Sequence, residues 1–248
     1  PVAGDPRALV AGVLGYLLVS VLGAVLVGSE TWHARVDPVE RVFRYYGAVG
    51  PVGRDDGSWR IRLPGEGVRE LDPPGSAGVA FAVALPWTTT FDGLAHTPAW
   101  NAAATWVVEW GLPPTVAYLG GLLGGFALCW VAYRVAVGGI RRRANSLLGH
   151  TELAGRFAVS LVPIAAGYHL AHFGEYVLAW LPGLVGVLGS PLSPDPVTPV
   201  AVPAWFGGVE LGAVLVGHLL GVWVAHAVAV DLFPGRLQAV RSQYPLVA

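Results

Sequence analysis

Five long apolar stretches constrain this 248-residue chain more than any other feature of its sequence. Each approaches the length of about 20 residues that an α-helix needs to cross a bilayer. They cover residues 8–27, 77–94, 114–137, 157–181 and 205–232. Charged residues make up 12% of the chain, whereas soluble domains carry about 25%. The sequence therefore predicts an all-α integral membrane protein, with about five transmembrane helices in a single membrane domain over residues 1–248.

The arginines predict how these helices are oriented. All fifteen basic residues are arginine, and all but Arg7 lie in or beside the connections 28–76 and 138–156 or after the last apolar stretch. The connections 95–113 and 182–204 contain none. Because loops rich in arginine stay on the cytoplasmic side, we expect a multi-pass protein of the cytoplasmic membrane with its N-terminus outside and its C-terminus inside.

Residues 30–76 form a polar segment on the side that is predicted to be cytoplasmic. Asp37, followed by a proline that suits the first helical turn, predicts a short helix that reaches Tyr46. Its apolar and charged residues fall on opposite faces, which favours a position on the membrane surface. Short alternating runs at 58–63 and 67–71 predict a small hairpin. We interpret the whole segment as a scaffold or docking surface.

Ionisable side chains gather in the later apolar stretches, where burial is unfavourable and such residues mark functional sites. They are Asp92 at the end of the second stretch, His169, His172 and Glu175 in the fourth, and His218 and His226 in the fifth. Counted along a helix from the cytoplasmic arginines, His172 and His218 lie at heights of about 24 and 27 Å. Asp92 can reach the same height. The sequence thus predicts a cluster of Asp92, His172, Glu175 and His218 in the outer half of the bilayer.

Three kinds of site fit this cluster. Haem b needs two imidazoles at one height on facing helices, which His172 (or His169) and His218 can supply within a respiratory electron-transport or oxidoreductase assembly; His226 is a further candidate ligand. Mixed imidazole and carboxylate ligands also suit a copper, iron or zinc ion. A proton or ion path uses the same residue types. For His169 and His226, a hydrogen bond between helices is the structural alternative.

Composition excludes several other classes of function. The net charge of −1 gives no bulk attraction for nucleic acid. The single cysteine, Cys129, excludes disulfides within the chain, cysteine zinc sites and iron–sulfur clusters. The expected partners are the lipid bilayer and either other membrane subunits or further copies of the chain, so a structural or assembly subunit is a remaining alternative.

Four stretches of the sequence resemble a family of multi-pass membrane proteins from actinobacteria and haloarchaea that is labelled fenitrothion hydrolase. They are DPVERVFRYYGAVGPVG (37–53), TTTFDGLAHTPAW (88–100), RFAVSLVPIAAGYHLAH (156–172) and GHLLGVWVAHAVAV (217–230). Members carry an FDG stretch, an AH pair late in the helix that contains PI, and two histidines eight residues apart in the last helix. These features fall on Asp92, His172, His218 and His226, whereas His169 and Glu175 lie outside the pattern.

The resemblance implies that the chain corresponds to the C-terminal half, or a shortened form, of longer family proteins. It also implies hydrolysis of an organophosphotriester. The sequence has no HxHxD ligand motif and no GxSxG nucleophile elbow. Such a hydrolase would therefore need Asp92, His172 and His218 to build a metal site across three helices.

Overall fold

The computed structural model describes residues 6–55, 57–193 and 196–247. The chain forms two compact units, Pro1–Ala48 and Val49–Ala248. The elements of the first are α1 (Pro6–Val27), α2 (Ser29–Thr31), the π-helical segment η2 (Trp32–Val36) and α3 (Pro38–Val49). Those of the second are β1 (Val52–Asp55), β2 (Ser58–Ile61), α4 (Glu66–Arg69), α5 (Ser76–Ala95), α6 (Pro98–Glu109), α7 (Pro114–Arg143), α8 (His150–Ala158), α9 (Leu161–Gly189), α10 (Phe206–Leu232) and α11 (Arg236–Val247).

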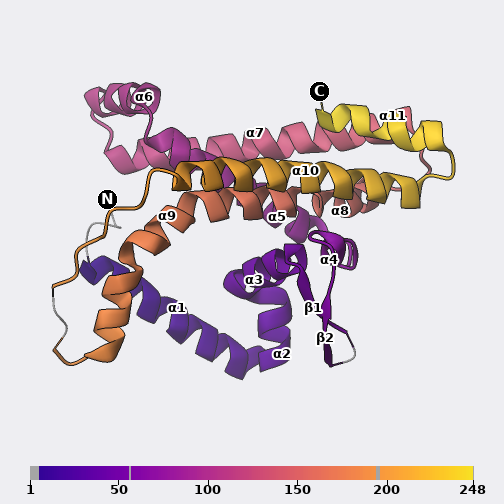
Figure 1. The fold of residues 1–248 in the computed structure, drawn as a ribbon. Coiled ribbons are helices and arrows are strands. Elements are labelled where there is room, and N and C mark those ends of the chain that lie inside the picture. Colours follow the sequence, from indigo (N-terminus) through magenta and orange to yellow (C-terminus); the bar gives the residue numbers. More distant parts are fainter. Residues whose placement is uncertain (1–5, 56, 194–195, 248) are drawn as a thin grey trace. The chain divides into compact units, whose positions relative to one another are not determined.

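In the first unit, the segment after the apolar helix α1 folds back along it (Figure 1). Gly28, with a φ of 87°, makes the turn. The Trp32 indole then packs directly on Gly23, leaving no room for a Cβ there. Further back, the Tyr16 hydroxyl lies 2.9 and 3.0 Å from the two carboxylate oxygens of Asp37. Asp37 therefore lies beside Tyr16, which is about 16 Å along the axis of α1 from the C-terminal end of that helix.

Asp37 caps α3, which forms where the sequence predicts a helix. Its Oδ1 accepts the backbone N–H groups of Val39 at 2.8 Å and of Glu40 at 3.2 Å. Burial by itself raises the pKa of the carboxyl, but the hydrogen bonds from Glu40, Tyr16 and Val39 and the nearby His33 outweigh it. The pKa of Asp37 therefore lies below its ordinary value.

Replacing Asp37 by alanine is expected to loosen α3, because a lost N-cap weakens a helix by about 1 kcal/mol, or roughly fivefold in local opening. Hydrogen exchange of the α3 peptides in the full-length chain measures this, with Asp72→Ala as the control. Since the folded-state pKa is depressed, the stabilisation is full above about pH 4 and is lost as the pH falls through the folded-state pKa. Equal exchange in the variant and the wild type would contradict the role of the cap.

The second unit begins with a hairpin. The strand at 58–61 pairs with the segment before it, residues 52–55, and not with residues 67–71 as predicted. β1 pairs antiparallel with β2, and Gly57, with a φ of 86°, lies in the turn between them. The predicted strand 67–71 is wrong, because most of it lies in the short helix α4. The cause is Gly65, whose φ of 84° turns the chain after β2 and precedes the first residue of α4.

Helices α5, α7, α9 and α10 form a bundle in which chain direction alternates (Figure 1). α5 and α9 run parallel, because Thr89 contacts His169 and, one turn further on, Asp92 contacts His172. α7 runs antiparallel to α5, and Trp87 of α5 donates its indole N–H to a carbonyl of α7 at 2.8 Å. This alternation is the one that successive membrane crossings require.

Glycines bring α9 and α10 into backbone contact. A Cβ on Gly167 would lie 2.5 Å from the carbonyl oxygen of Ala213, and a Cβ on Gly217 would lie 2.7 Å from that of Pro163. Small residues that let backbones approach are typical of helix pairs in membranes. The contact fixes an antiparallel register in which Gly167 faces Gly217.

Four helical segments of the described residues are long and apolar enough to cross a membrane. They are Pro6–Val27, Pro114–Arg143, His150–Gly189 and Phe206–Leu232. The second predicted span forms the helix α5, which is not one of these four. Five crossings and their orientation therefore stay predictions. The third segment contains a break, since α8 ends at Ala158 and α9 begins at Leu161.

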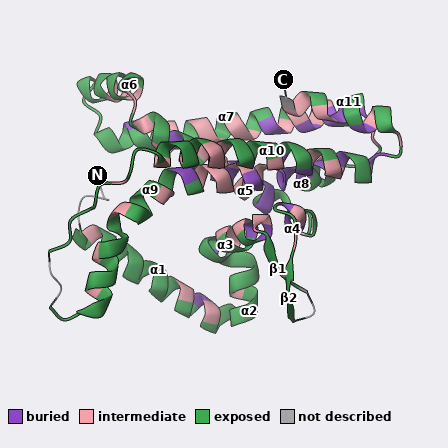
Figure 2. Cartoon of the chain, viewed as in Figure 1, coloured by how far each residue is buried: buried purple, intermediate pink, exposed green. Residues whose placement is uncertain are grey.

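The buried core of the second unit lies toward the end that carries its arginines (Figure 2). Its largest fully buried side chains include Ile140, Leu153, Phe157 and Val224. Toward the other end, the long helices expose apolar side chains such as Leu119 and Leu188. Extended exposed apolar surface of this kind marks contact with a membrane or a partner.

Candidate histidine–carboxylate site

A contact between the side chains of Asp92 in α5 and His172 in α9 forms the centre of the candidate site. Asp92 Oδ2 lies 2.6 Å from His172 Nε2, and the two side chains are 48% and 36% exposed. The parallel packing of α5 and α9 produces this contact, since both residues lie one turn beyond another contacting pair, Thr89 and His169. The structure thus brings together Asp92 and His172, two of the four residues of the predicted cluster.

The contact between Thr89 and His169 lies one helical turn before the contact between Asp92 and His172. Thr89 Oγ1 donates to the Leu85 carbonyl at 3.1 Å and lies 3.1 Å from His169 Nδ1. The same nitrogen lies 3.0 Å from the Ala165 carbonyl. Because a carbonyl can only accept, the proton of a neutral His169 is on Nδ1 and is shared between two oxygens. His169 is thus a hydrogen-bonding residue between helices, as the structural alternative for it expected.

The contact between Asp92 and His172 borders an open pocket of about 600 Å³. The residues that line it are Asp92, His96, His172, Phe173, Glu175, Tyr176, Ala179 and Trp180. His96 Nδ1 lies 2.8 Å from the Asp92 carbonyl oxygen, which leaves Nε2 with the lone pair of a neutral ring. A carbonyl that holds one ring nitrogen is the usual second contact of a metal-binding histidine. Two imidazoles and two carboxylates therefore border one pocket.

The structure does not bring His218 to this pocket. Gly167 of α9 faces Gly217 of α10, and the two helices are antiparallel. His172 follows Gly167 by five residues and His218 follows Gly217 by one, so the two histidines lie on opposite sides of this contact and six residues apart along the bundle. Six residues of helix correspond to about 9 Å along the axis. The exposed His218 ring contacts its own helix, with Nδ1 2.8 Å from the Val214 carbonyl oxygen. The contact between Gly167 and Gly217, and not the distance from an arginine, sets the relative heights of His172 and His218.

His226 lies in the half of α10 toward the arginine-bearing end, where its Nδ1 is 3.2 Å from Oε1 of Gln243 in α11. It does not border the pocket either. Within residues 6–55, 57–193 and 196–247, no three His, Cys, Asp or Glu side chains are grouped closely enough, as they stand, to hold a metal ion. Asp92 and His172 are the pair from which such a site could be built.

Comparison of the chain with models of protein families, with curated proteins and with solved structures gives no match. The resemblance to the fenitrothion hydrolase family therefore stays a prediction.

The sequence also contains signals for two further residues beside Asp92 and His172. His96 follows Asp92 by four residues, which is the spacing of neighbours on one helical face. Thr89 precedes Asp92 by three residues, as His169 precedes His172. Because both pairs have the same spacing, two parallel helices that bring Asp92 to His172 also bring Thr89 to His169, one turn away.

Proposed function

We propose that this chain is a multi-pass protein of the cytoplasmic membrane whose outer pocket binds a transition-metal ion through Asp92 and His172. The observation that carries the proposal is the 2.6 Å contact between these two side chains at the edge of a pocket that also contains Glu175 and His96. An imidazole and a carboxylate at hydrogen-bond distance are a common nucleus for zinc, iron or copper.

The orientation rests on the arginines. Arg156 of α8 and Asp231 near the end of α10 border one cavity, and the end of α7, after Arg143, contacts α11. The arginine-rich connections thus meet at one end of the bundle, which the positive-inside rule assigns to the cytoplasm. Asp92 and His172 lie toward the opposite end and hence in the outer half.

Metal binding at this pair requires exchange of a proton for the ion. Nε2 of His172 faces Asp92 at 2.6 Å, so a proton between them would have to leave before Asp92 and His172 could hold a metal ion. Glu175 follows His172 by three residues and borders the same pocket. Glu175 and His96 are the side chains that would complete the coordination after a change of rotamer. A redox-active ion here would suit a subunit of a respiratory or oxidoreductase assembly.

The register of α9 and α10 favours an ion over haem b. A haem held by His172 and His218 needs both imidazoles at one iron, whereas these two residues are offset by about 9 Å along their helices. The pocket that borders His172 is instead lined by Asp92 of α5, by His96 directly after α5, and by residues of α9.

Metal titration of the purified chain in detergent tests the proposal. After removal of metal with a chelator, Co²⁺ should bind with one equivalent and give visible d–d bands, and Zn²⁺ should displace it. Asp92→Ala is expected to weaken binding by about 100-fold, whereas Glu109→Ala, outside the pocket, should bind as the wild type does. Absence of Co²⁺, Zn²⁺ and Cu²⁺ binding to the wild type would overturn the proposal.

A second candidate function is metal-dependent hydrolysis. The Asp92 carboxylate contacts one nitrogen of an imidazole, which is the arrangement that orients and strengthens a general base. The resemblance to the fenitrothion hydrolase family implies a phosphotriester as the substrate. Turnover that depends on added metal and disappears in Asp92→Ala would support it; turnover unchanged in that variant would assign the reaction elsewhere.

A further inference from the structure

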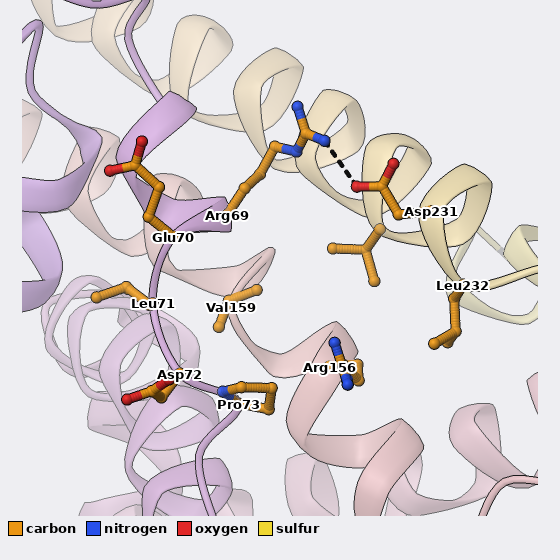
Figure 3. A pocket seen from close by; sticks show the side chains of 10 residues that line it. Arg69, Glu70, Leu71, Asp72, Pro73, Arg156, Val159, Asp231 and Leu232 are labelled. Atoms are coloured by element: carbon orange, nitrogen blue, oxygen red, sulfur yellow. Dashed lines mark hydrogen bonds and ion pairs between the residues drawn. The ribbon is translucent and has the colours of Figure 1, made fainter.

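A second cavity lies at the arginine-bearing end of the bundle, away from the Asp92–His172 pair (Figure 3). Its volume is about 280 Å³, near the lower limit of about 300 Å³ for pockets that bind small molecules. It is lined by Arg69, Glu70, Leu71, Asp72, Pro73, Arg156, Val159, Val228, Asp231 and Leu232. These come from α4 and the segment after it, α8 with the break that follows, and the end of α10.

Two guanidinium groups face this cavity, whereas two of its three acidic residues do not. In Figure 3 the side chains of Arg69 and Arg156 border the hollow, and those of Glu70 and Asp72 are directed away from it. Asp231 remains, with Oδ2 2.6 Å from the Arg69 guanidinium. The charged side chains that border the hollow in Figure 3 are therefore two arginines and one carboxylate.

Both arginines keep donors for a ligand. Arg69 contacts Asp231 through one of its nitrogens, and its guanidinium lies 5.9 Å from the centre of the Trp223 ring. Arg156 lies 3.9 Å from Glu152, at the limit of an ion pair, and both side chains are about half exposed. Exposed pairs of this kind are weak. A guanidinium has five N–H donors and binds phosphate oxygens in pairs, so each arginine keeps N–H groups that can donate to a phosphate oxygen.

The rest of the cavity wall is apolar. Val159, Val228 and Leu232 border it beside the charged groups, and Val230, next to Asp231, is 52% exposed on α10. A soluble anion would gain nothing from such a wall, whereas the glycerol and upper acyl carbons of a lipid would bury it. Basic pockets between transmembrane helices on the cytoplasmic side are suited to anionic lipid headgroups.

We propose that this cavity binds the headgroup of an anionic phospholipid, with its phosphate between Arg69 and Arg156. The Arg69–Asp231 pair keeps one guanidinium in position, and Arg156, whose Glu152 partner lies 3.9 Å away, supplies the more weakly paired charge. The apolar wall receives the glycerol end of the lipid. This site is independent of the outer pocket and of any metal bound there.

Native mass spectrometry of the delipidated full-length chain tests the proposal. Phosphatidylglycerol and phosphatidylcholine with identical acyl chains are added in separate titrations. Phosphatidylglycerol is expected to bind more tightly, and Arg156→Gln should weaken its binding by about tenfold, the value of one charge-assisted contact. Arg141→Gln, a charge change at the same end but outside the cavity, should leave the affinity within about twofold.

A second variant, Leu232→Trp, tests the apolar wall of the cavity without changing its charge. Leu232→Trp fills the apolar wall and should also weaken phosphatidylglycerol binding, so the test does not depend on the folding of Arg156→Gln alone. Equal affinity for the two lipids, or equal affinity in Arg156→Gln and Arg141→Gln, would overturn the proposal. Full displacement of the lipid by millimolar inorganic phosphate would also overturn it, by assigning the cavity to a free anion.

Discussion

Gly217→Val is expected to lower the free energy of unfolding by about 3 kcal/mol, the upper end of what an added side chain causes in a packed interface. A Cβ at this position would lie 2.7 Å from the Pro163 carbonyl oxygen and 3.1 Å from the Gly167 Cα. Both neighbours are backbone atoms, so no rotamer change can relieve the contact. The two helices must separate, which removes close packing along much of α9 and α10.

Gly212→Val is the matched control on the same helix. A Cβ on Gly212 has no atom within 4 Å, and the same residue type is introduced, so the change in helix propensity is shared by the two variants. Denaturation of both variants in one detergent, followed by circular dichroism, gives the difference. Equal loss of stability in the two would mean that Gly217 does not lie at the contact between α9 and α10.

His172→Ala is expected to weaken metal binding by about 100-fold, whereas His218→Ala should leave it unchanged. The two residues have the same chemistry and both lie in long apolar helices, so the comparison tests position alone. His172 contacts Asp92 at the pocket, and His218 contacts the carbonyl of its own helix. Calorimetric titration with Zn²⁺ in detergent measures both affinities.

An equal loss in the two variants would contradict the pocket described here. If the wild type also had a Soret band that disappeared in both, His172 and His218 would be ligands of one haem. Comparison of His172→Ala with His218→Ala therefore distinguishes a site at the pocket beside Asp92 from a site formed jointly by α9 and α10.

The long helices could be predicted from the sequence because an apolar run of about 20 residues has few alternatives to a membrane-crossing or buried helix. All five predicted stretches are helical for most of their length. Helix α6 was not predicted, although Thr97 gives its signal. Thr97 Oγ1 accepts the Trp100 N–H at 3.2 Å, and a proline follows it, which is the pattern of a helix start.

The candidate site could be predicted only in part. Proximity of Asp92 and His172 followed from their similar heights in helices of the same direction. The position of His218 did not follow, because glycine contacts, not distance from an arginine, set the register of α10 against α9. Whether Gly167 faces a backbone or lipid depends on which helix is its neighbour, and a single sequence does not identify that neighbour.

The two contacts between α5 and α9 restrict movement of α5 beside the pocket that Asp92 and His172 border. Asp92–His172 and Thr89–His169 are one turn apart on both helices, so α5 cannot slide along α9 without losing both. A ligand that separates the upper pair leaves α5 pivoting on the lower one. Trp87, two residues before Thr89 in α5, packs against Gly125 of α7 and would move with α5. A ligand that displaced α5 in this way would therefore also shift its contact with α7, and the indole fluorescence of Trp87 is expected to change when the ligand binds.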